Sequence, residues 1–105
     1  MKKGYLAEYQ AKKILIKKYG KNNVFKIAIG GILDFLILSP DSNKIIKIVE
    51  IKKTKKNKWY LNDHDKKQIK ILKKIKKTHK IPIEYWIKIK NKWYFYEIDE
   101  IEKII

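Results

Sequence analysis

The chain of 105 residues has the length of one domain, which we place at residues 1–105, and its 45% hydrophobic content is enough for a compact core. Its 27 basic residues are all lysine and stand against 11 acidic residues, so the net charge is +16 and a polyanionic partner is expected. The absence of cysteine excludes disulfide bonds and thiolate metal sites, and no apolar run approaches the roughly 18 residues of a membrane span.

Three readings of this charge stay open. Nucleic acid is the favoured partner, because each phosphate contact releases counterions and so gains affinity at low salt. An anionic membrane surface would require a basic amphipathic helix dedicated to the lipid. The third reading is a solvated surface in a lysine-rich proteome. Lysine without arginine favours contact with the phosphate backbone over bidentate reading of guanine. The N-terminus shows no signal-peptide core, so we expect a cytoplasmic protein.

The first part of the chain predicts one helix followed by strands. Apolar residues recur at helical spacing and end at Gly20, which is typical of a helix C-terminus. The pair Gly30-Gly31 should break a strand, and the turn residues at 40–43 should join two apolar runs into an antiparallel hairpin. The expected elements are a helix over 4–19, strands over 24–29, 32–38 and 45–54, and a further short strand over 58–61.

The second part predicts a helix, a hairpin and a short final helix. Asn62 or Asp63 can cap the helix, and Pro82 follows its end at about His79. Two alternating runs surround a turn at 90–92. The expected strands are 83–89 and 93–98, and the final helix is 99–105. The element order predicts an α/β (α+β) fold, with a mixed central sheet flanked by helices.

Two carboxylates interrupt these apolar strands. Asp34 lies inside one run and Glu50 inside the next, and Lys52 shares a face with Glu50 because side chains alternate along a strand. A buried carboxylate is costly unless a cation or a donor meets it. If the two strands pair, the three side chains converge, and a divalent cation such as Mg²⁺ would relieve the repulsion between the carboxylates. The alternative is that Asp34 and Glu50 face solvent or pair with surface lysines.

Four further side chains on the two helices were weighed for a role. Glu8 lies at the apolar margin of the first helix, so it either joins the acidic pair or forms an exposed ion pair with Lys12. Gln68 lies on the apolar stripe of the second helix and needs buried partners there, unless it sits at the helix edge. His64 and His79 have no metal-ligand spacing, and we expect neither metal binding nor acid–base chemistry from them.

A dense positive segment directly follows the acidic residues and suits a phosphate backbone. Aromatic residues nearby and in the last hairpin have two open roles, because they could stack on bases or pack against the sheet. The lysines expected to contact DNA are Lys26, Lys53, Lys55, Lys56 and Lys58, and the aromatic residues are Trp59, Tyr60, Trp93, Tyr94 and Tyr96.

This pattern resembles the PD-(D/E)xK nuclease superfamily and, within it, the archaeal Holliday junction resolvases. The resemblance covers roughly the first 80 residues in order. The matching segments are Gly4-Tyr5-Leu6-Ala7-Glu8, Gly30-Gly31-Ile32-Leu33-Asp34, Val49-Glu50-Ile51-Lys52-Lys53-Thr54 and Trp59-Tyr60-Leu61. Three positions depart from the family pattern: Leu33 replaces the proline of the motif, and Lys26 and Gly30 stand where the resolvases carry an arginine and a serine.

The resemblance implies a restriction-endonuclease-like αβββαβ core and phosphodiester hydrolysis dependent on Mg²⁺ or Mn²⁺. It implies that Asp34 and Glu50 are metal ligands, that Lys52 orients or polarises the attacking water, and that Glu8 is an accessory acidic residue at the metal. Gln68 would be an accessory residue flanking the motif. A homodimer that cuts four-way DNA junctions symmetrically is implied as well. The alternatives are a non-catalytic DNA-binding protein and a nicking or repair nuclease of the same superfamily.

Overall fold

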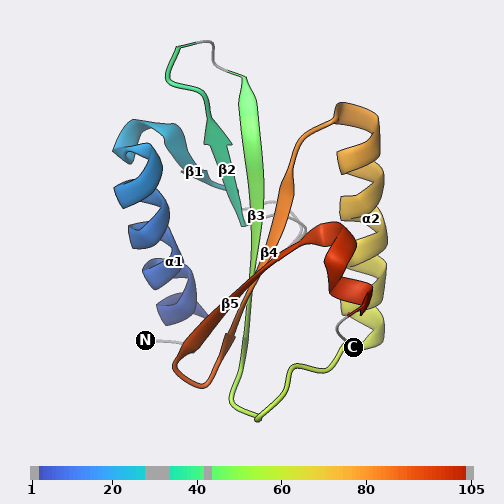
Figure 1. Ribbon diagram of the computed structural model, residues 1–105. Helices are drawn as coiled ribbons and strands as arrows, with labels where there is room; N and C mark the ends of the chain where they lie inside the picture. The colour runs from blue at the N-terminus through green and yellow to red at the C-terminus, as the bar shows by residue number, and fades with distance from the viewer. Residues whose placement is uncertain (1–2, 28–33, 42–43, 104–105) are drawn as a thin grey trace.

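The structure is a computed structural model that describes residues 3–27, 34–41 and 44–103. A single mixed sheet of five strands lies between helices (Figure 1). The elements in chain order are α1 (Lys3–Tyr19), the 3₁₀ turn η1 (Lys21–Asn23), β1 (Val24–Lys26), β2 (Phe35–Leu38), β3 (Ile45–Thr54), α2 (Asp63–His79), β4 (Ile83–Ile89), β5 (Lys92–Glu97) and the 3₁₀ helix η2 (Ile98–Lys103). The expected mixed α+β architecture is confirmed.

The strands lie in the order β1-β2-β3-β4-β5, and every neighbouring pair is antiparallel except β3 and β4. The parallel pair requires a crossover, and α2 supplies it. The antiparallel pairing of β2 with β3 and the hairpin of β4 with β5 confirm both predicted hairpins. The second hairpin turns at Lys90–Asn91, where Lys90 adopts a φ of 56°, as tight hairpin turns require.

The sheet separates two apolar clusters. On one face α1 packs Ala7, Ala11 and Leu15 against β1 to β4, and on the other face α2 and η2 cover β3 and β4 (Figure 1). Alternation along β3 therefore sends Val49 and Ile51 toward α1, while Glu50 points toward α2. In the described part of the chain, no helix has the length and apolar character to cross a membrane.

Local sequence explains why α2 begins and ends where it does. The side chain of Asn62 accepts a hydrogen bond from Asp65 N at 2.7 Å, and the Asp65 carboxylate accepts one from Asn62 N at 3.2 Å, which completes a capping box. At the other end Lys80 adopts the left-handed conformation and donates its N–H to Lys76 O, shortly before Pro82. Of the two expected caps, Asn62 is the one used.

Several elements differ from the sequence expectations, and α1 and β5 each begin one residue earlier than expected. No strand forms over 58–61; the segment leads into the cap of α2, and Trp59 packs against the apolar cluster under that helix. β1 ends at Lys26 rather than at 29, and β2 begins at Phe35, after Asp34. The final helix is the 3₁₀ element η2, which begins one residue early. The expectations for 28–33, 42–43 and 104–105, including those on Gly30 and Leu33, lie outside the described residues.

Candidate active site

Pairing of β2 with β3 brings Asp34 and Glu50 together. Asp34 precedes β2 directly, and the register Phe35↔Val49 places it beside Glu50 on the neighbouring strand. The backbone N–H of Ile51 donates to Asp34 Oδ2 at 2.6 Å. This hydrogen bond holds the Asp34 carboxylate against β3, so its orientation is set by a backbone N–H group of that strand.

Glu50 is a buried carboxylate with one oxygen unsatisfied. Its side chain lies on the α2 face of β3, and the residue is only 2% exposed. Oε1 accepts a hydrogen bond from Gln68 Nε2 at 2.8 Å, whereas Oε2 accepts no hydrogen bond from the described residues. A buried oxygen without a donor costs free energy unless a proton or a cation meets it.

The electrostatics of the pair favour a proton or a cation between the carboxylates. Burial, and after it the charge of Asp34, raise the pKa of Glu50 from 4.5 to about 9, although Lys52 and Gln68 oppose this. Burial also raises the pKa of Asp34, against the hydrogen bond from Ile51 N–H. Two crowded carboxyl groups of this kind share protons when no cation is bound.

Gln68, on α2, connects Glu50 on β3 to Tyr85 on β4. The Tyr85 hydroxyl donates to Gln68 Oε1 at 3.2 Å, which leaves the Gln68 amide nitrogen to face Glu50. Burial raises the pKa of Tyr85 well above its ordinary value, so the hydroxyl stays protonated and available as a donor. The prediction that Gln68 needs buried partners is confirmed, because its side chain is buried between α2 and the sheet.

Lys52 lies between two acidic side chains. Its Nζ is 3.5 Å from Glu50 Oε1 and 3.7 Å from Asp65 Oδ1. Asp65, which is not among the residues predicted from the sequence, is only 6% exposed. The signal was present in the sequence, because Asp65 stands three residues after Asn62, the spacing of a capping box. Asp65 thus both caps α2 and holds Lys52 beside Glu50.

Glu8 reaches the same region from α1. Its carboxylate pairs with Lys26 Nζ at 2.6 Å, so the i,i+4 partner Lys12 weighed from the sequence is not its partner. Glu8 is still close enough to Asp34 to raise the pKa of that carboxyl, although less strongly than burial does. Lys26, expected to contact DNA, therefore lies near the acidic cluster in this structure.

The donor set of the acidic pair suits a hard divalent cation. Asp34 and Glu50 offer carboxylate oxygens, the ligands that Mg²⁺ prefers, and the unsatisfied Glu50 Oε2 has no competing donor in this part of the protein. Over residues 3–27, 34–41 and 44–103, no three His, Asp or Glu side chains gather into a complete metal site. A cation on this pair would take its other ligands from water or phosphate oxygens, as Mg²⁺ commonly does.

Of the five lysines expected to contact DNA, all except Lys26 lie at the end of β3 or directly after it. Lys53 lies within β3 and is partly buried, while Lys55, Lys56 and Lys58 are exposed in the connection between β3 and α2. The backbone N–H of Lys56 donates to Thr54 Oγ1 at 3.1 Å, which shapes this connection. His64 and His79 are both exposed, one at each end of α2.

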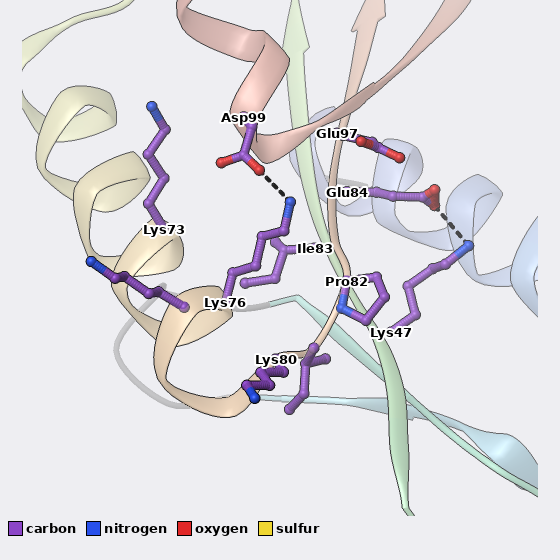
Figure 2. A pocket seen from close by; sticks show the side chains of 11 residues that line it. Lys47, Lys73, Lys76, Lys80, Pro82, Ile83, Glu84, Glu97 and Asp99 are labelled. Carbon is purple, nitrogen blue, oxygen red and sulfur yellow. Dashed lines mark hydrogen bonds and ion pairs between the residues drawn. The ribbon is translucent and has the colours of Figure 1, made fainter.

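A larger groove lies at the opposite end of α2 from Gln68 (Figure 2). It has a volume of about 870 Å³ and lies between the C-terminal end of α2, the start of β4 and η2. Two ion pairs lie in it, because Lys76 binds Asp99 and Lys47 binds Glu84 at 3.2 Å. The groove does not include Asp34, Glu50 or Lys52.

Comparison with solved structures confirms the fold. The chain superposes on a Holliday junction resolvase, Hjc of the archaeal hyperthermophile Archaeoglobus fulgidus, with a TM-score of 0.63. The match covers 91% of this chain and 78% of the resolvase at 16% sequence identity. The chain has the fold of that resolvase. No protein-family model and no curated protein matches the sequence. The resemblance stated from the motifs is thus confirmed at the level of fold.

Proposed function

We propose that this protein is a structure-selective DNA endonuclease that depends on a divalent metal ion and acts on four-way junctions. The observation that carries the proposal is the convergence of Asp34, Glu50 and Lys52 at one point of a resolvase-like fold. The carboxylates come from adjacent strands, and Lys52 approaches Glu50 to 3.5 Å. The alternative weighed above, exposed carboxylates paired with surface lysines, does not describe Glu50, which is buried.

Each side chain has a distinct part in this proposal. Asp34 and Glu50 would hold Mg²⁺ or Mn²⁺, with Asp34 oriented by Ile51 N–H and Glu50 by Gln68. When bound, the metal ion supplies positive charge against the scissile phosphate. Lys52, held between Glu50 and Asp65, would orient a water molecule for in-line attack and stabilise negative charge on the phosphate. Glu8 would be an accessory acidic residue at the metal.

The proposed partner is DNA, and its binding is separate from the chemistry. Lys26, Lys53, Lys55, Lys56 and Lys58 would contact the phosphate backbone, where lysine acts as a point charge. The net charge of +16 favours strong, salt-dependent association. We further propose that the single domain acts as a homodimer, because resolution of a junction needs two symmetric cuts.

The test is incubation of pure protein with a four-way junction, a linear duplex and a single strand of the same sequence, with Mg²⁺ and with chelator. Paired nicks near the branch point that appear only with Mg²⁺ support the proposal. Equal cutting of all three substrates would indicate a nuclease without junction preference. Tight junction binding without cutting at any Mg²⁺ or Mn²⁺ concentration would refute the nuclease and favour a DNA-binding protein.

A further inference from the structure

The connection between β3 and α2 forms the rim of a small groove beside the candidate active site. The groove has a volume of about 260 Å³ and shares Lys52 and Asp65 with that site. Its lining combines positive charge with aromatic surface. The residues that line it are Lys52, Lys53, Thr54, Lys56, Trp59, Tyr60, Asn62 and Asp65.

Trp59 anchors the rim to the candidate active site. Its ring lies 5.2 Å from the ring of Tyr85, centroid to centroid, and packs against the apolar cluster under α2. Tyr85 in turn donates to Gln68, which donates to Glu50. The backbone that carries the next residue, Tyr60, is therefore held in a fixed relation to the acidic pair.

Tyr60 presents its ring to solvent at this rim. It is 62% exposed, so it adds little to the packing of the fold. The ammonium group of Lys56 lies 5.9 Å from the centre of the Tyr60 ring. An exposed ring accompanied by an ammonium group matches a nucleotide, because a base stacks on the ring while its phosphate meets the cation.

We propose that this groove is a nucleotide-binding subsite in which Tyr60 stacks on an unstacked base of the DNA strand and Lys56 binds its phosphate. The proposal deepens the proposed function and rests on it for the identity of the strand. A continuous duplex keeps its bases stacked on one another, whereas a branch point can release one at low cost. The subsite would therefore make the affinity for branched DNA higher than the affinity for a continuous duplex.

The chain offers a closely matched control for this subsite. Tyr9 is 43% exposed and has the Lys13 ammonium 4.6 Å from its ring centre, but it lies on α1, on the other face of the sheet. Tyr9→Ala therefore removes an exposed tyrosine ring with a lysine ammonium group over it, as Tyr60→Ala does, but away from the groove. Tyr60→Phe keeps the aromatic face and removes only the hydroxyl.

The experiment uses a four-way junction with 2-aminopurine placed in turn at each strand's branch point, in chelator, so that no cleavage is needed. Tyr60→Ala should weaken junction binding about fivefold or more, which is the loss of one base–aromatic stack. In the saturated complex, 2-aminopurine at one of the four positions should be brighter with Tyr60→Ala than with wild type, because the released base loses its stacking quencher. Tyr60→Phe and Tyr9→Ala should behave as wild type.

The outcomes separate the subsite from the nuclease. Equal losses of affinity in Tyr60→Ala and Tyr9→Ala, or identical fluorescence in wild type and Tyr60→Ala at all four positions, would overturn the subsite even if the protein cuts junctions. The expected fluorescence difference without cleavage at any metal concentration would establish the subsite and refute the endonuclease.

Discussion

Replacing Glu50 by Gln should stabilise the protein in chelator, and the gain should grow with pH. In the folded protein the pKa of Glu50 is raised to about 9, first by burial and next by Asp34, whereas the ordinary value is 4.5. A carboxyl whose pKa is raised on folding favours the fold fully below pH 4.5 and loses this contribution as the pH rises toward 9. Wild-type stability therefore falls across this window, and the Glu50→Gln variant escapes the fall.

The size of the effect follows from the position of Glu50 in the structure. Within this window the wild-type free energy of unfolding falls by about 1.4 kcal/mol per pH unit. Protonation of Glu50 on folding therefore costs about 3 kcal/mol at pH 7 and less than about 1 kcal/mol at pH 5. The substituted amide can keep the hydrogen bond from Gln68 through its oxygen and turn its NH₂ group to Asp34. A gain of about 3 kcal/mol is large against the usual stability of a small domain, about 5 to 15 kcal/mol.

The assay is urea unfolding in chelator at pH 5, 6, 7 and 8, followed by tryptophan fluorescence. The difference in free energy of unfolding between variant and wild type should rise steadily over this series. Glu97→Gln, which removes an exposed carboxylate at the far end of β4 and β5, should show almost no such trend. A variant less stable than wild type at pH 7 would refute the reasoning, because it would mean that Glu50 is ionised and held by Lys52.

Three further predictions concern metal, DNA and Glu8. Mn²⁺ should raise the melting temperature of wild type and not of Glu50→Gln; equal rises would contradict Glu50 as a ligand. Junction affinity in chelator should fall with salt at a log–log slope of magnitude at least about 4, and joint replacement of Lys53, Lys55 and Lys56 by Gln should weaken binding without unfolding. A flat salt response would exclude nucleic acid as the partner. The Glu8→Gln variant should cleave the junction more slowly than wild type, and added Mn²⁺ should partly restore the rate. An unchanged cleavage rate at every metal concentration would show that Glu8 only forms an ion pair and has no part in metal binding.

The parts of the structure that local sequence determines could be predicted. The capping residue Asn62 directly precedes α2, and Pro82 follows shortly after its end, so both helix limits can be predicted from the local sequence. The hairpins likewise have turn residues between their two strands. The convergence of Asp34 and Glu50 required only that two successive strands pair in the expected register. Each of these predictions depended only on a single segment or on two elements that follow one another in the chain.

The parts that depend on distant contacts were missed. The segment 58–61 has strand-like composition, but in the structure it leads into the cap of α2 and packs Trp59 against the apolar cluster under that helix. Nothing in the local sequence distinguishes Lys88 from the other lysines, yet it is buried and donates to Gln10, which lies far away in the sequence on α1. Asp65 carries its capping signal locally, whereas its approach to Lys52 exists only once α2 packs on the sheet.

The most direct test of the endonuclease is the single-turnover rate of junction cleavage in Mg²⁺ by wild type and by Asp34→Asn, both at concentrations that saturate the junction. Loss of one carboxylate from the pair should slow cleavage by roughly a thousandfold or more. Junction affinity in chelator should stay equal or tighten, because a negative charge near the phosphate is gone. Cleavage by Asp34→Asn at a wild-type rate per folded molecule would contradict the account.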